Sequence, residues 1–309
     1  MTASTIAGLT GIDSVTDICV VHLIRKKNGI EPFRQFLSSY LNHRAGIEHD
    51  LLIIYKGFYR KVDMVPYENL LKDVPHSYMQ VADFGFDLRA YFLAAEECNY
   101  KYFCFFNSFS IILDHEWLLK LYRHITQPDV GMAGATGCWG SVIIGRLSTN
   151  KNQPLWKKII RRLLWRIIRA YQRQYFHVFP NPYMRTNAFM MSRDNMLKIK
   201  KGIIVTKTYT HKLESGKQGF TRQVIKMGLK VIVVGRNGIG YEAKDWLSSN
   251  TFWHGKQDNL LISDNKTRTY SDDNLDLKKI LETYAWGNAV NRTQAENRLA
   301  HDIDAINTP

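Results

Sequence analysis

Short apolar runs alternate with helix-patterned segments along the first part of the chain, and this alternation limits the fold more than any other feature. Runs of this kind are typical of buried strands, and the segments between them carry apolar residues at helical spacing. Strands are expected at residues 18–24, 49–58, 78–85 and 100–110, and helices at 31–41, 67–74, 88–99 and 114–125. This order predicts an α/β fold in which helices flank a mostly parallel sheet.

The pattern defines one main domain with a segment on either side. Residues 17–240 carry the α/β pattern, which continues through a helix at 220–228 and a strand at 230–235. Residues 1–16 form an N-terminal tail, and residues 241–309 form an aromatic and polar C-terminal extension with one helix near its centre. A chain of 309 residues, 45% of them hydrophobic, can bury a substantial core.

The net charge of +14 is concentrated in one basic stretch. Residues 130–193 contain eleven basic residues and no acidic one. Within them, residues 154–176 predict a basic amphipathic helix whose apolar and cationic faces are opposite each other. The apolar face carries Trp156, Ile160, Leu163, Leu164, Ile167 and Tyr171, and the cationic face carries Lys158, Arg162, Arg166, Arg169 and Arg173. This composition favours an anionic membrane surface as a partner.

Two alternatives for the basic helix stay open: packing of its apolar face on the protein core, and contact with nucleic acid. No nucleic-acid partner is expected, because no nucleic-acid-binding motif accompanies the charge. The four cysteines lack CxxC spacing and indicate a reduced, intracellular protein. With neither a signal peptide nor a spanning helix expected, the sequence predicts a cytoplasmic protein associated peripherally with the inner face of the membrane.

The segment from Asp83 to Ile125 resembles part of the family 2 glycosyltransferases and their relatives with the GT-A fold. In that family a glycine-containing turn opens a helix, and a hydrophobic strand then ends in an acidic DxD motif. Residues 20–41 look like the family's first strand, nucleotide-facing loop and helix, and residues 213–234 are similar to its acidic acceptor-site motif and the helix and strand that follow. The resemblance implies a GT-A-like fold and sugar transfer from a nucleotide-sugar.

The chain departs from this family at the DxD motif, where it has Asn107, Ser108, Phe109 and Ser110. Neutral oxygens are weaker ligands than carboxylates for a divalent ion. Either the enzyme works without a metal and holds the diphosphate with cationic side chains, or the fold is kept and catalysis is lost. Use of Mg²⁺ or Mn²⁺ also stays open, although no metal-binding residue is assigned.

The expected donor-binding residues lie at the carboxyl ends of the predicted strands, where open α/β sheets bind ligands. They are Arg25, Asp83, Asp87, Arg89, Asn107, Ser108 and Ser110. Arginine binds phosphate through paired hydrogen bonds, and the resemblance implies that the two aspartates contact base or ribose. Alternatively, residues 25–27 are a solvated loop and Asp87 caps the helix that follows it.

Glu214 is the expected catalytic base. It lies eight residues before Arg222, close to the family's spacing between its acidic motif and its helix arginine. An inverting transfer needs a carboxylate that removes the proton of the acceptor hydroxyl. His211 is the alternative base, and a structural role for Glu214 in a polar loop also stays open. The resemblance places Arg185, Asn187 and Arg222 on the acceptor side.

The sequence therefore predicts a glycosyltransferase that moves a sugar from a nucleotide-sugar to a hydroxyl of a lipid-linked or cell-envelope glycan. The alternative is a non-catalytic scaffold of the same fold that binds a glycan or a nucleotide at the membrane. Aromatic and polar residues between Trp246 and Tyr270 are suited either to stacking on sugars or to packing against the main domain.

Overall fold

The computed structural model describes residues 16–143, 155–202, 204 and 206–289, and within these ranges it leaves the side chains of 155–163 and 207 undescribed. Almost the whole predicted N-terminal tail and the last part of the C-terminal extension lie outside the described residues. The side chains of five predicted residues of the basic helix also lie outside the described part: Trp156, Lys158, Ile160, Arg162 and Leu163.

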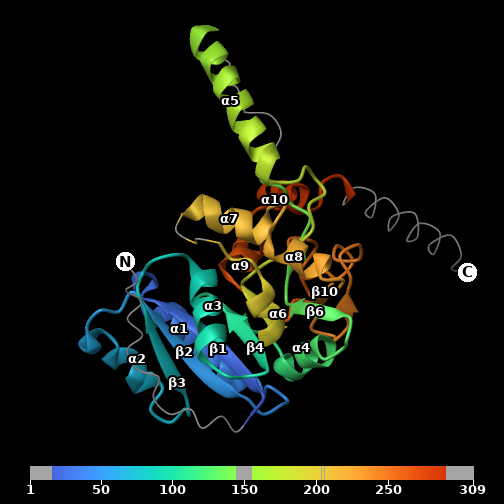
Figure 1. Ribbon diagram of the computed structural model, residues 1–309. Helices are drawn as coiled ribbons and strands as arrows, with labels where there is room; N and C mark the ends of the chain where they lie inside the picture. Colours follow the sequence, from blue (N-terminus) through green and yellow to red (C-terminus); the bar gives the residue numbers. More distant parts are fainter. Residues whose placement is uncertain (1–15, 144–154, 203, 205, 290–309) are drawn as a thin grey trace, which may run out of the picture.

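The centre of the molecule is an eight-stranded mixed sheet (Figure 1). Its strand order is β11-β10-β6-β9-β4-β1-β2-β3. The pairs β1–β2, β1–β4, β2–β3 and β6–β10 are parallel, whereas β9 is antiparallel to both of its neighbours and β11 to β10. The strands are β1 (Ile18–Arg25), β2 (Asp50–Lys56), β3 (Ser77–Val81), β4 (Tyr102–Phe106), β6 (Val130–Gly134), β9 (Ala188–Ser192), β10 (Lys230–Val234) and β11 (Gly240–Tyr241).

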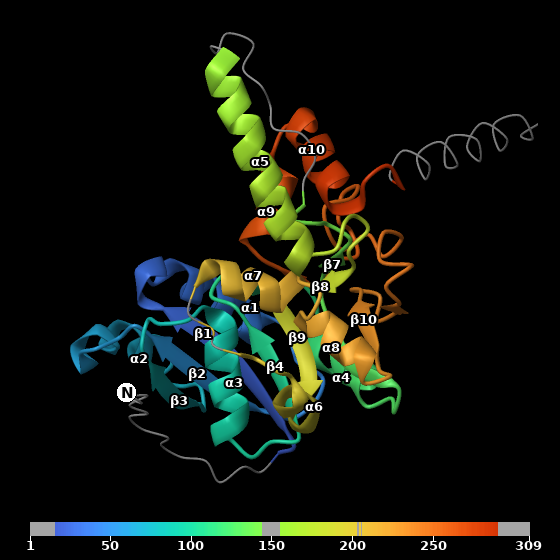
Figure 2. The same cartoon turned by 45° about the horizontal axis from the view of Figure 1, so that its top comes forward.

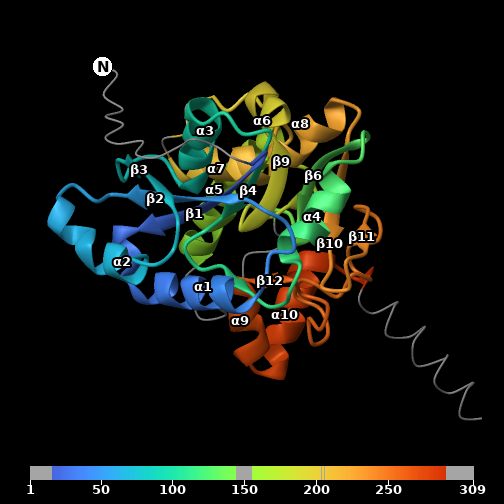
Figure 3. The ribbon, with the colours of Figure 1, turned by 90° about the horizontal axis from the view of Figure 1, so that it is seen from below.

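Helices cover both faces of this sheet, as Figure 3 shows from below. One face packs against α1 (Glu31–Asn42), α2 (Val65–Leu70) and α4 (Trp117–Ile125), and the other against α3 (Asp87–Glu97), α6 (Arg193–Lys198) and α8 (Phe220–Lys226). The predicted fold class, a mostly parallel mixed sheet flanked by helices, is confirmed.

Strand β1 shows why the apolar runs are continuous rather than alternating. Val20 and Ile24 belong to the core on one face of the sheet, and Cys19, Val21 and Leu23 belong to the core on the other. Because successive side chains of a strand point to opposite faces, a strand covered on both sides needs apolar residues at every position. His22 is the exception within β1; its ring is fully buried and stacks on Phe36 with 3.6 Å between the ring centroids.

The predicted basic helix is present as α5 (Leu155–Tyr175) and projects away from the sheet (Figures 1 and 2). Four large apolar or aromatic side chains on its described part are exposed: Leu164 by 53%, Ile167 by 60%, Ile168 by 52% and Tyr171 by 43%. This part of the helix therefore does not pack its apolar face on the core, which was one of the alternatives that the sequence left open. In the described part of the chain, no helix has the length and apolarity needed to cross a membrane.

Residues beyond 241 join the core of the main domain. Trp246 and Trp286 are fully buried, which agrees with packing rather than sugar stacking for these two side chains. The region contains β12 (Ile262–Ser263), which pairs with β5 (Ile111–Ile112), and the helices α9 (Asn265–Asp272) and α10 (Leu275–Trp286). A further small sheet joins β7 (Gly137–Cys138) to β8 (Tyr183–Met184).

Candidate active site

A cavity of about 250 Å³ lies at the carboxyl edge of β4. Strand β4 ends at Phe106, which pairs with Ala188 at the start of the antiparallel β9. Asn107, which follows Phe106, therefore lies next to Asn187, which precedes Ala188. The backbone N–H of Asn107 donates to the carbonyl of Asn187 at 2.9 Å. Six of the residues singled out from the sequence line this cavity: Asp87, Asn107, Arg185, Asn187, His211 and Glu214.

Helix α7 (Lys207–Ser215) carries both candidate bases. The interpretation of Glu214 as part of a polar loop was wrong, because a hydroxyl-capped helix forms there, with Thr206 as its N-cap. His211 and Glu214 stand three residues apart, which places them on one side of the helix. Oε1 of Glu214 accepts a hydrogen bond from the Thr186 hydroxyl at 2.8 Å, so the carboxylate is held in place.

Asp87 is the first residue of α3, and the hypothesis that it caps this helix was wrong. The N-cap is Phe86, and no side chain makes the capping hydrogen bond. Burial raises the pKa of Asp87 above its usual range, and the negative charge of Glu214 adds to this shift, while Lys56 and Arg25 oppose it. The carboxyl group is therefore free to serve a ligand in the cavity instead of the helix backbone.

Asn107 presents a hydrogen-bond donor to the cavity, not an acceptor. Its Oδ1 accepts from the backbone N–H of Phe109 at 3.0 Å, and the Ser110 hydroxyl lies 3.0 Å from both this oxygen and the carbonyl of Asn187, so its one proton is shared between them. A backbone N–H can only donate, which fixes Oδ1 as the atom facing it. The amide NH₂ is what remains for a ligand, and Ser110, which is fully buried, positions Asn107 from behind.

Asn187 presents a second amide donor through a directed chain of hydrogen bonds. Arg185 donates to Thr136 Oγ1 at 3.3 Å, and the Thr136 hydroxyl donates to Asn187 Oδ1 at 2.7 Å. Asn187 is 3% exposed, and its Nδ2 has no hydrogen-bond partner among the described residues. A buried donor without a partner costs about 1–3 kcal/mol, so this group is suited to donate to a ligand oxygen.

Arg185 is fixed by residues of the C-terminal extension. Its guanidinium lies 2.6 Å from the carboxylate of Asp264 and stacks over the ring of Phe252 at 4.4 Å. Asp264 is 1% exposed and also caps α9 through a capping box. Burial alone would raise the pKa of Asp264, but the charge and hydrogen bond of Arg185 outweigh it and hold the pKa below its usual range.

The other predicted donor-binding residues lie outside the cavity. Arg25 and Asp83 bind each other, with Nε and Oδ1 2.8 Å apart, and Lys27 joins the same carboxylate at 3.2 Å. The guanidinium of Arg89 lies over the ring of Phe84, 5.2 Å from its centroid. Ser108 is buried and donates to the carbonyl of Leu23 at 2.8 Å, so its hydroxyl is used within the fold.

Arg222, predicted on the acceptor side, also lies outside the cavity. It contacts Asn181 at 3.5 Å, and burial lowers its pKa.

Lys56 is a neighbouring charge that sequence reasoning missed. Its ammonium is buried at the end of β2 and donates to the carbonyl of Gly85 at 2.6 Å. Burial lowers the pKa of Lys56 to about 8. The sequence does carry a signal for this residue, because a lysine that ends an apolar strand next to the carboxyl end of β1 lies at the ligand-binding edge of the sheet.

The described residues around Asn107 and Ser110 do not fit a divalent metal. Among them, no group of three or more His, Cys, Asp or Glu side chains is arranged to hold an ion. The oxygen of Asn107 already accepts a hydrogen bond from the backbone N–H of Phe109 and lies 3.0 Å from the Ser110 hydroxyl. This position offers N–H donors, which bind anions and not cations.

Several glycosyltransferases have structures that are partly similar to this chain. The mannosyltransferase PcManGT from Pyrobaculum calidifontis, solved with GDP-Man and Mn²⁺, matches 58% of this chain and 45% of its own at 9% identity and a TM-score of 0.37. The bifunctional glycosyltransferase WbbM matches 66% and 38% at 12% identity and a TM-score of 0.38. The galactosyltransferase LgtC, solved with donor and acceptor sugar analogues, matches 68% and 69% at 9% identity and a TM-score of 0.38.

The match therefore spans less than half of the first two of these proteins. No protein-family model matches the chain, and no curated protein matches it in sequence.

Proposed function

We propose that this protein is a GT-A-like glycosyltransferase that moves a sugar from a nucleotide-sugar to a hydroxyl of a lipid-linked or cell-envelope glycan. The observation that carries the proposal is the single cavity at the edge of β4. It brings Asp87 and Asn107, expected on the donor side, together with Arg185 and Asn187, expected on the acceptor side, and with Glu214 of α7.

In this proposal Glu214 removes the proton of the attacking hydroxyl, and the transfer inverts the anomeric carbon. Thr186 holds one carboxylate oxygen, so the other oxygen is available to the substrate. His211, the second candidate, is exposed on the same side of α7. The amide donors of Asn107 and Asn187 hold anionic or hydroxyl oxygens, since both present N–H groups to the cavity.

Donor binding in this proposal needs no divalent metal. The proposal is supported by Asn107, which the resemblance aligns with the DxD motif and whose NH₂ remains as a donor for a ligand, and by the charges near Asp87, which include Lys56 and Arg25. Calorimetric titration with nucleoside diphosphates and their sugars, in EDTA and in Mn²⁺, tests this directly. Binding that survives EDTA agrees with the proposal, and binding that requires Mn²⁺ contradicts it.

Replacement of Glu214 tests the assignment of the base. Glu214→Gln keeps the shape and the contact with Thr186 but cannot take a proton, so turnover is expected to fall by about 10²–10⁴-fold while donor affinity is unchanged. Glu97→Gln, on the exposed end of α3, is the matched control and should leave turnover unaltered. Equal turnover of Glu214→Gln and the wild type would exclude Glu214 as the base.

We also propose that the protein acts on the cytoplasmic face of a membrane. The helices α5 and α10 lie at the same end of the molecule (Figures 1 and 2), and both carry exposed apolar residues, which include Leu164, Ile167, Ile168, Leu275 and Ile280. Arg166, Arg169 and Arg173 on α5 supply positive charge for anionic head groups.

A non-catalytic scaffold is the second candidate, and it is favoured by one specific observation: residues 107–110, which the resemblance aligns with the family's metal-binding motif, contain no carboxylate. The same titration separates the candidates. A protein that binds no nucleotide in any condition but still binds glycan would be a scaffold.

A further inference from the structure

A second cavity lies on the other side of α7 from the candidate active site. Its volume is about 490 Å³, within the range of about 300–1,000 Å³ that is typical of ligand pockets. Tyr209, Lys212 and Leu213 of α7 line it, whereas Thr210, His211 and Glu214 line the first cavity. One helix therefore separates the two cavities and contributes side chains to both.

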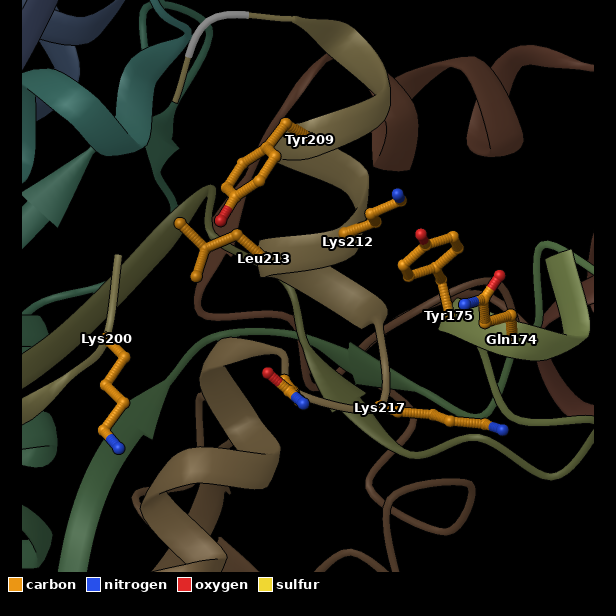
Figure 4. A pocket seen from close by; sticks show the side chains of 8 residues that line it. Gln174, Tyr175, Lys200, Tyr209, Lys212, Leu213 and Lys217 are labelled. Atoms are coloured by element: carbon orange, nitrogen blue, oxygen red, sulfur yellow. The ribbon is translucent and has the colours of Figure 1, made fainter. Parts of the chain in front are cut away.

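The charge in this second cavity is entirely positive. Lys200, Lys212 and Lys217 line it, and no acidic residue is among its described lining. Figure 4 shows that the three lysines come from three different segments around the cavity. Among the described residues, every lysine that forms an ion pair is a lysine other than these three. No described carboxylate therefore neutralises the charges of the three lysines.

The surroundings show the same excess of charge. Burial lowers the pKa of the nearby His177, and the positive charges of Arg222, Lys217 and Lys226 lower it further. Three uncompensated lysines with no acid in a concave site are suited to an anion of high charge density, such as a phosphate group.

The cavity also lies at the root of α5. Gln174 and Tyr175, at the end of that helix, line it, and the backbone N–H of Lys217 donates to the carbonyl of Tyr175 at 2.8 Å. The ammonium of Lys212 lies over the ring of Tyr175, 3.1 Å from its centroid, and 4.8 Å from that of Tyr171. The second cavity is thus next to α5, the helix whose apolar side chains are exposed.

We propose that this cavity, the lysine pocket, binds the phosphate head group of a membrane lipid whose apolar part lies along α5. The combination of a cationic cavity and an adjoining exposed apolar helix matches the two parts of such a molecule, whereas a free anion has no use for the apolar part. The inference rests on the membrane association proposed above and not on sugar transfer. If the acceptor is lipid-linked, the pocket holds its phosphate about one helix diameter, roughly 10 Å, from Glu214.

The test is co-flotation of the full chain with vesicles of phosphatidylcholine containing either phosphatidic acid or phosphatidylserine at equal surface charge. The wild type is expected to prefer phosphatidic acid, which exposes a phosphate monoester. Each lysine is expected to contribute about fivefold to binding. Lys200→Gln with Lys217→Gln should therefore weaken binding to these vesicles by about 25-fold, and the triple variant that adds Lys212→Gln should weaken it by about a hundredfold in total. Lys61→Gln, Lys72→Gln and Lys256→Gln, three exposed lysines elsewhere, are the charge-matched control and should keep the preference.

Two further arms separate the possible outcomes. Leu164→Ser with Ile167→Ser should abolish flotation with both vesicles but leave calorimetric binding of inorganic diphosphate unchanged, which distinguishes failure of α5 from failure of the pocket. Retained preference for phosphatidic acid in the double lysine variant would refute the site. Binding of free diphosphate as tight as that of the vesicles would show that the pocket serves a soluble anion and would refute the lipid assignment.

Discussion

The ion pair between Arg185 and Asp264 should contribute far more to stability than the exposed ion pairs of this protein. The side chains of these two residues are 14% and 1% exposed, and their charged atoms are 2.6 Å apart. Removing one partner of a buried pair leaves the other charge without compensation, which costs about 3–5 kcal/mol. Asp264→Asn should therefore lower the free energy of unfolding by about that amount.

This substitution isolates the ion pair from the other role of Asp264. The carboxylate also caps α9 by accepting from the backbone N–H groups of Lys266 and Thr267. Asparagine caps helices about as well as aspartate, so the cap should survive in the variant. The matched control is Asp129→Asn, which breaks the exposed pair with Lys230, where both side chains are about half exposed.

Urea unfolding followed by circular dichroism measures both variants. We expect a large shift of the midpoint for Asp264→Asn and a much smaller one for Asp129→Asn. Since Arg185 lines the candidate active site and orients Asn187 through Thr136, the first variant should also weaken ligand binding at temperatures where it stays folded. Equal small losses in the two variants would refute the reasoning.

Further predictions concern residues elsewhere in the fold. Burial lowers the pKa of His22 from 6.5 to about 3, so the unfolded chain binds the proton first and the stability of the wild type should fall by about 1.4 kcal/mol per pH unit as the pH drops below about 6.5. The unfolding free energy of His22→Phe minus that of the wild type should therefore rise with that slope as the pH drops, and a constant difference would contradict it. Gly137→Ala would place a Cβ 2.7 Å from the ring of Trp246 and should cost about 1–3 kcal/mol in thermal unfolding, whereas Gly228→Ala meets no atom within 4 Å and should show only backbone strain from its φ of +79°.

The strands and helices could be predicted because their signal is local. Each apolar run from β1 to β4 is bounded by polar or turn residues, and a strand buried on both faces needs no knowledge of its neighbours to be recognised. Helix α5 was equally clear, since its periodicity and one-sided charge are properties of 21 consecutive residues. Helix α7 was missed because its apolar residues are few, and its N-cap Thr206 gave too weak a signal.

The candidate site could be predicted only in part, because it depends on contacts between distant segments. Strand ends indicated Asp87 and Asn107, and the family resemblance indicated Arg185, Asn187 and Glu214. Contacts of the side chains stayed hidden: Ser108 uses its hydroxyl on Leu23, and Arg25 uses its guanidinium on Asp83. No pattern along the chain encodes the pairing of residues 58 or 85 positions apart.

The sequence by itself determined the α/β architecture, the position of the basic helix and the absence of a carboxylate in residues 107–110, because each of these is written in consecutive residues. Only the tertiary structure decided which polar groups remain available. It turned the oxygen of Asn107 inward and left its NH₂ for a ligand, and it brought Asp264 from the C-terminal extension to Arg185. The physical reason is that a buried polar group takes whichever partner the packing brings near, and that choice is made by the whole chain.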